Sequence, residues 1–202
     1  MFCASPITWS RAGSPTIRPT RSRRCCRHAS GRGSRRVELI EENGSPFWRF
    51  SLATYRKPSV AEACLALQDD HGVDVNVLLF VMWLGTQGRR LDAGEILRVR
   101  DAAAGWAGDV VVPLRMIRRC LKDAPPLVAS AAAQAFRTQV KRLELEAERL
   151  EQEALFGLAA TLPVPDGTPP EAAVGANVET LAQAMGTAFP AAAVERLVSA
   201  VV

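Results

Sequence analysis

The segment from residue 69 to residue 88, DDHGVDVNVLLFVMWLGTQG, constrains the fold more than any other part of this chain. Every residue from Val77 to Leu84 is apolar. Asp74 stands where an N-cap would, because its carboxylate can accept a hydrogen bond from a backbone N–H two or three residues later. A helix that begins there is apolar on all sides for two turns, so other helices must surround it. The run is too short to cross a bilayer, which takes about 20 apolar residues. The segment therefore predicts the central helix of a small bundle.

The flanking segments predict the helices that surround this one. N-terminal capping signals stand at Ser45–Pro46, Ser59–Glu62 and Asp92–Glu95, and each precedes apolar residues at helical spacing. Gly72 is placed to end the helix before the central one. No segment keeps the alternation typical of a strand. We therefore predict an all-α fold, a small helical bundle of about five to six helices around a central apolar helix.

The second half of the bundle shows a break and then a long helix. Gly105 and Gly108 interrupt one helix, and Asp109 is placed to cap the next. A single helix is predicted from about residue 129 to residue 160. Its apolar residues alternate spacings of four and three, as in the seam of a coiled coil; they are Phe136, Val140, Leu143, Ala147, Leu150 and Ala154. This seam indicates packing within the bundle or an interface with another chain.

Composition divides the chain into four parts. Residues 1–44 form an Arg- and Ser-rich tail, which we predict to be disordered. Residues 45–162 form the helical bundle. The prolines and glycine in 163–176 indicate a linker, and 177–202 predicts short C-terminal helices.

Charge is distributed very unevenly between the tail and the body. Residues 1–37 contain nine arginines and no acidic residue, whereas the other 165 residues carry 16 basic and 21 acidic groups. The basic character of the chain therefore belongs to the tail, which would bind nucleic acid only non-specifically. Three interpretations of the tail remain open: a functional leader or phosphate-binding arm, a disordered segment without a role, and sequence upstream of a translation start near Val37.

Several uncommon residues between about 45 and 160 match a known family in order. The matching segments are Phe47–Ser51, Tyr55, Ala63–Leu65, Leu67–Asp69, Gly72–Asn76, Leu78–Phe80 and Trp83–Gly85. This part of the chain resembles a bacterial family of conserved hypothetical proteins, domain of unknown function 2390. The resemblance implies a bacterial, soluble, all-helical protein, and it implies no mechanism because the family has no established activity.

The sharpest candidate for chemistry is an acidic cluster, Asp69, Asp70 and Asp74. Three carboxylates near a helix end suit Mg²⁺, which prefers oxygen ligands and bridges to phosphates. Against this hypothesis, Gly72 is expected to break the helix between the aspartates, and no second acidic cluster is evident. The alternative is that Asp69 and Asp70 are a solvated helix end and Asp74 a cap.

A polar pocket beside the central helix is a second candidate. Asn76 begins the apolar run, and a buried amide must find hydrogen-bond partners, which Arg49 and Tyr55 are placed to supply. With Asp69 and Trp83 these residues form the walls of a predicted ligand pocket. The alternative is a structural hydrogen bond that fixes helix register.

A basic stripe is a third candidate. Its residues fall at i, i+3, i+4 and i+7 of one predicted helix; they are Arg115, Arg118, Arg119 and Lys122. Such a stripe suits phosphate or an acidic partner, and it also suits the solvated face of a helix near its C-terminus.

No complete catalytic constellation is present, so the sequence favours a non-catalytic protein-interaction or structural module over an enzyme. Its predicted partner is another protein or a second copy, bound through the 136–154 seam. The alternative is a protein that binds a small molecule or a Mg-phosphate group beside the central helix. No cofactor is predicted. The five cysteines show no disulfide or zinc spacing, and no secretory or membrane segment is evident, so a cytoplasmic location is expected.

Overall fold

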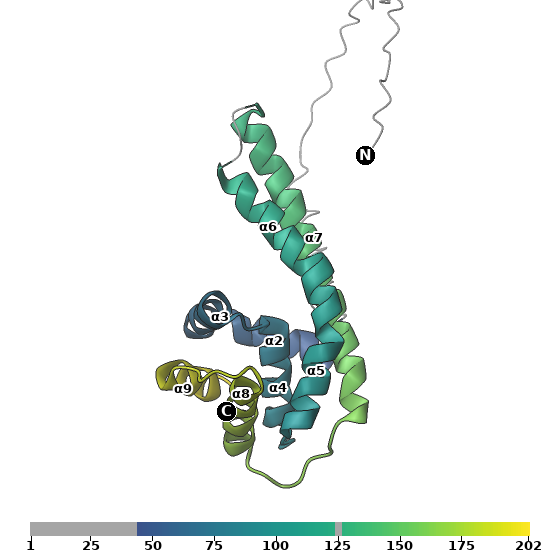
Figure 1. The fold of residues 1–202 in the computed structure, drawn as a ribbon, viewed down its shortest axis with the longest axis vertical. Helices are drawn as coiled ribbons and strands as arrows, with labels where there is room; N and C mark the ends of the chain where they lie inside the picture. Colours follow the sequence, from purple (N-terminus) through teal and green to yellow (C-terminus); the bar gives the residue numbers. More distant parts are fainter. Residues whose placement is uncertain (1–43, 124–126) are drawn as a thin grey trace, which may run out of the picture.

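The computed structural model describes residues 44–123 and 127–202, and all regular structure in them is helical (Figure 1). The all-α prediction is therefore confirmed. The predicted tail lies, apart from Gly44, outside the described residues. The elements are α2 (Pro46–Tyr55), α3 (Pro58–His71), α4 (Val75–Thr86), α5 (Ala93–Trp106), the π-helix η1 (Ala107–Val111), α6 (Val112–Cys120), the 3₁₀ turn η2 (Leu121–Asp123), α7 (Ser130–Leu158), the 3₁₀ turn η3 (Ala159–Thr161), α8 (Pro170–Ala184) and α9 (Ala191–Ser199).

Helix α4 is the centre of the bundle, as predicted. Its residues from Asn76 to Gly85 are all buried. Asp74 caps the helix: its Oδ1 accepts from the backbone N–H of Asn76 at 2.8 Å and of Val77 at 3.3 Å. Helices α2, α5, α7 and α8 pack around it, so its apolar surface is covered on every side.

Most of the predicted local start and stop signals are present in the structure. Ser45 and the Asp92–Glu95 capping box begin their helices, and Gly72 ends α3 in the left-handed region with φ of 67°. The capping box predicted at Ser59–Glu62 is wrong. Helix α3 begins at Pro58 without a side-chain cap, because proline at the first helical position needs no N–H partner. Ser59 is thus already inside the helix.

The C-terminal helices belong to the same core. Helix α8 begins at Pro170, so residues 170–176, which the sequence analysis assigned to the linker, are helical. Its side chains Val174, Val178 and Leu181 are buried in the core that α4 organises. Asn177, fully buried, donates to the carbonyl oxygens of Val81 and Arg89, both at 2.9 Å, and accepts from the N–H of Leu91 at 2.8 Å. One side chain therefore ties α8 to α4 and to the start of α5.

Helices α5, η1 and α6 run on from one another and pack against α7, forming a two-helix arm that projects from the bundle (Figure 1). The predicted break at Gly105 and Gly108, with a new cap at Asp109, is wrong. Both glycines remain helical, and the five residues of η1 form a π-helix. Its wider turn ends two residues before Pro113, whose ring and missing N–H would disturb a regular α-helix.

No helix of the described part of the chain is both long enough and apolar enough to cross a membrane.

Candidate functional site

A cavity of about 530 Å³ lies where α2, the junction between α3 and α4, and the base of the arm meet. Its polar lining includes Tyr55, Gln68, Asp69, Asp74, Asn76, Arg115, Glu148, Glu151 and Gln152. Its apolar lining includes Trp48, Leu52, Leu79, Val111, Met116 and Leu145. The volume falls in the range of small-molecule pockets.

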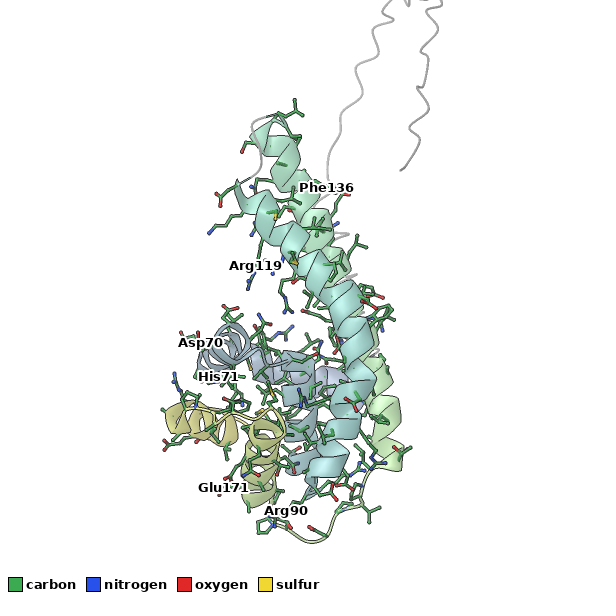
Figure 2. All side chains as sticks on the ribbon, in the orientation of Figure 1. Asp70, His71, Arg90, Arg119, Phe136 and Glu171 are labelled. Atoms are coloured by element: carbon green, nitrogen blue, oxygen red, sulfur yellow. The ribbon has the colours of Figure 1, made fainter. Side chains whose placement is uncertain are left out.

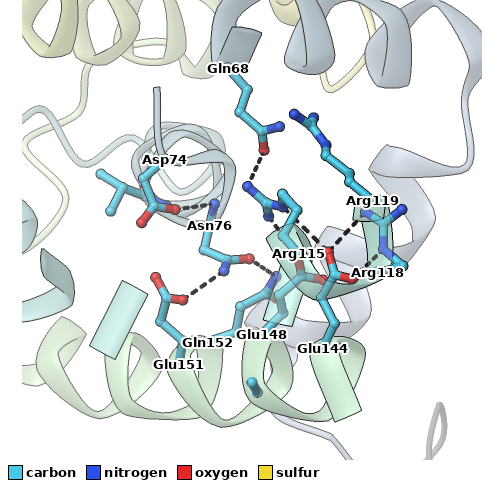
Figure 3. A network of polar contacts seen from close by, with 12 residues as sticks. Gln68, Asp74, Asn76, Arg115, Arg118, Arg119, Glu144, Glu148, Glu151 and Gln152 are labelled. Atoms are coloured by element: carbon cyan, nitrogen blue, oxygen red, sulfur yellow. Dashed lines mark hydrogen bonds and ion pairs between the residues drawn. The ribbon is translucent and has the colours of Figure 1, made fainter. Parts of the chain in front are cut away.

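Asn76 joins α4 to α7 at this cavity (Figure 3). Its Nδ2 donates to Glu151 Oε2 at 2.9 Å, and its Oδ1 accepts from Gln152 Nε2 at 2.7 Å. The prediction that Arg49 or Tyr55 would satisfy Asn76 is therefore wrong. Both partners come from a helix 75 residues further along the chain, and no local pattern indicates them.

Glu151 is an unusual carboxyl group, because only 4% of its surface is exposed. Burial, above all, and then the negative charge of Asp74 raise its pKa from 4.5 to about 8. The Glu151 carboxyl group is therefore mostly protonated at neutral pH.

The arginines of the predicted stripe face two different ways. Glu144 on α7 is buried and accepts hydrogen bonds from both Arg115 and Arg118 (Figure 3). Arg115 also donates to Gln68 at 2.7 Å and to Glu148 at 3.0 Å. Two of the four basic residues thus join α6 to α7 and α3 and are not a solvated face. The two others are exposed: Arg119 pairs with Asp69 at 3.2 Å, and Lys122 lies in η2, after the end of α6.

The three predicted magnesium ligands make different interactions in the structure. Asp69 pairs with Arg119, and Asp74 caps α4, as described above. Asp70 lies exposed beside His71 near the end of α3, as Figure 2 shows. Gly72 separates Asp74 from that helix end. Within residues 44–123 and 127–202, no group of three or more His, Cys, Asp or Glu side chains is arranged to hold a metal ion.

Three of the five predicted pocket residues line the cavity; they are Tyr55, Asp69 and Asn76. Arg49 instead donates to the carbonyl oxygen of Gly44. Trp83 lies in the core, where it contacts the rings of Phe47, Phe80 and Phe156.

Sequence reasoning missed the residues that α7 contributes to the cavity, namely Leu145, Glu148, Glu151 and Gln152. One signal was available. Glu144, Ala147 and Glu151 follow the spacing of the buried face of α7, so two acidic residues fall among apolar ones on one helical face. Charges in such positions require partners, and this identifies them as candidates for a site or an ion-pair network.

The cavity holds two buried acceptors without a partner. They are Glu151 Oε1 and Gln152 Oε1, and neither accepts a hydrogen bond from the described part of the chain. The indole Nε1 of Trp48 is a third buried polar atom without a partner. Such atoms are rare in folded proteins, because losing water without a replacement costs about 1–3 kcal/mol.

The arm exposes a second, apolar hollow of about 630 Å³ between α5 and α7. Its lining includes Ala102, Trp106, Leu150, Ala154 and Leu158. The predicted seam is split between two faces of α7. Val140 and Ala147 are buried, whereas Phe136, Leu143, Leu150 and Ala154 are exposed. Figure 2 shows Phe136 on the arm, away from the bundle.

The thiol of Cys64 is inaccessible to solvent. The residue is fully buried in the core, and burial raises the pKa of its thiol to about 12. The reactive thiolate is therefore not formed near neutral pH.

A family profile described as "Protein of unknown function (DUF2390)" matches residues 46–155, more than half of the chain. The chain belongs to this family. The DUF2390 match runs from α2 to near the end of α7, so it includes the whole lining of the cavity and most of the arm. Helices α8 and α9 lie outside it. Comparisons with curated proteins and with solved structures find no match.

Proposed function

We propose that this DUF2390 protein is a non-catalytic protein-interaction module whose arm is the contact surface. The observation that carries this proposal is the concentration of exposed apolar side chains on one part of the molecule. Of 15 large hydrophobic residues exposed among the described residues, ten lie between residues 106 and 150; they are Trp106, Val112, Met116, Ile117, Leu127, Val128, Phe136, Leu143, Leu145 and Leu150. Extended apolar surface on one element is typical of an interaction site.

The outer face of α7 suggests how a partner would bind. Phe136, Leu143 and Leu150 follow one another at intervals of seven residues and are 53%, 58% and 44% exposed. A seven-residue repeat is the spacing at which two helices pack along a common seam. A second copy of the chain presents the same repeat, so we propose self-association along this stripe.

Light scattering coupled to size-exclusion chromatography tests the proposal on the full chain. We expect a dimer at micromolar concentration that dissociates on dilution. Leu143→Glu should shift the chain to a monomer, because the substitution places a carboxylate in an apolar interface. Leucine and glutamate both favour helix, so α7 should keep its structure, which circular dichroism would verify.

Leu65→Glu is the matched control, since Leu65 is 45% exposed and lies on α3, outside the stripe on α7. This variant should remain dimeric. Two results together would overturn the proposal. The wild-type chain would be monomeric at every concentration, and it would capture no protein that the Leu143→Glu variant, used as bait in the same way, fails to capture.

A further inference from the structure

The cavity beside α4 has a built polar floor. Glu151 and Gln152 are each only 4% exposed, and Asn76 holds both of them in place through the two hydrogen bonds described above. They come from a single rigid helix, α7. The floor is therefore ordered before any ligand arrives.

Hydrogen-bond donors and acceptors on this floor can be assigned. A carboxylate oxygen accepts, so Asn76 must present its NH₂ group to Glu151. Its carbonyl oxygen then faces Gln152, which must present its own NH₂ group. With the amide groups oriented in this way, neither Gln152 Oε1 nor Glu151 Oε1 accepts a hydrogen bond. Once Glu151 is ionised, the floor thus offers two acceptors that lack a donor.

The charges around the floor favour a positive ligand. Carboxyl groups of Asp69, Asp74, Glu148 and Glu151 line the cavity, against the guanidinium groups of Arg115 and Arg119. Both arginines already bind carboxylates, Arg115 at Glu144 and Glu148 and Arg119 at Asp69. An anion entering the cavity would meet Glu151 and Asp74 with no arginine free of a carboxylate partner. A cation would meet two oxygens that lack donors.

We propose that the cavity binds a small organic cation, whose ammonium or guanidinium group donates hydrogen bonds to Glu151 Oε1 and Gln152 Oε1. The hydrocarbon part of the ligand lies against the apolar wall of Trp48, Leu79 and Met116. This site is separate from the outer stripe of the arm, and its test does not depend on the oligomeric state.

Binding of the organic cation displaces the proton carried by Glu151. Without ligand, the proton on Glu151 leaves this buried group neutral, with Asp74, Glu148 and Arg115 as the other charged groups nearby. When R–NH₃⁺ binds, Glu151 ionises and its proton leaves for the solvent. At pH 7, uptake of the cation should therefore release close to one proton. Near pH 8, where about half of the Glu151 groups are ionised, the release should be about half a proton, and it should fall toward zero at higher pH.

Thermal unfolding and calorimetry of the full chain test this proposal. The probes are n-butylamine, 1,4-diaminobutane and n-butylguanidine at millimolar concentration. Butan-1-ol, butyrate, inorganic phosphate and MgCl₂ are the comparison compounds. We expect only the cations with N–H donors to raise Tm, because a ligand that binds only the folded state stabilises it. Calorimetry in buffers of different ionisation enthalpy measures the proton released.

Three variants make the test specific. Glu151→Gln should weaken binding of the cations at least tenfold and abolish proton release. Met116→Trp should also weaken binding by filling the cavity, and because Met116 is 61% exposed this variant should fold normally. Glu146→Gln lies on the same helix outside the cavity lining and should bind as the wild type does. A Tm unchanged by the cations, an equal shift in Glu151→Gln, or a response only to MgCl₂ and phosphate would each overturn the proposal.

Discussion

Glu151 is the residue whose behaviour depends most on its surroundings. On the surface of α7 it would be one more acid in a charged helix, with a pKa near 4.5. In the folded chain, burial first and then Asp74 raise the pKa of Glu151 to about 8. The folded protein therefore retains a proton that the unfolded chain has already released between these two pH values.

This difference predicts that stability falls as pH rises. The contribution of Glu151 to the free energy of unfolding is fully present below about pH 4.5 and is lost progressively as pH approaches about 8. One pKa unit corresponds to about 1.4 kcal/mol, so the loss over the window is a few kcal/mol. Urea unfolding at pH 5, 6.5 and 8 measures it. Glu151→Gln keeps an acceptor for Asn76 but cannot ionise, so the variant should lose much less stability over the same range. Parallel pH profiles for the two proteins would contradict the assignment.

At the level of elements, the closest packing in the core is between α4 and α8. A Cβ atom on Gly85 would lie 2.6 Å from Val174 Cα and 2.7 Å from its backbone nitrogen. Backbone atoms cannot move aside as the end of a side chain can. Glycine at this position thus allows the two helices to approach each other, and α8 then covers the C-terminal half of the central helix.

Gly85→Ala should therefore destabilise the protein by about 1–3 kcal/mol, even though alanine is the better helix former. Gly105→Ala is the matched control, because Gly105 lies in α5 and a Cβ there meets nothing within 4 Å. That control should gain up to about 1 kcal/mol from helix propensity alone. Urea unfolding measures both changes, and a neutral Gly85→Ala would show that the contact between the two helices is looser than in this structure.

At the scale of the whole molecule, the C-terminal helices complete a core that the family match does not cover. The match ends at residue 155, but α8 packs directly on α4, and α9 packs on α3 and α8. Leu181 and Leu197 are as fully buried as the residues of the central helix. The bundle and its C-terminal helices therefore share a single hydrophobic core.

A chain that ends at Leu162 should consequently fail to unfold cooperatively. Removing α8 and α9 would expose one side of α4, an apolar helix that needs cover on every side. We expect broad thermal unfolding by circular dichroism, increased dye binding to exposed apolar surface, and aggregation. The intact chain is the reference. A truncated protein with the wild-type Tm would show that the C-terminal helices form a separate unit.

The structural features that can be predicted from the sequence alone are local. The caps at Ser45, Asp74 and Asp92, and the left-handed glycine at Gly72, are all present in the structure. Each depends only on hydrogen bonds between residues within about five positions of one another, so the neighbouring residues in the sequence determine it. The central position of α4 follows as directly, because a helix apolar on every side has no stable place except inside a bundle.

Tertiary structure decided the features whose partners are remote in the sequence. Asn76 meets Glu151 and Gln152, and Arg115 meets Glu144, only because α7 folds back along α6 and against α4. Which residues face each other then depends on the path of the α5–η1–α6 segment, and the π-helix alters the rotation of every residue after it. Local periodicity indicates which residues share a helix face. It does not indicate which face of another helix they meet, and that meeting creates the cavity, the raised pKa of Glu151 and the exposed stripe on the arm.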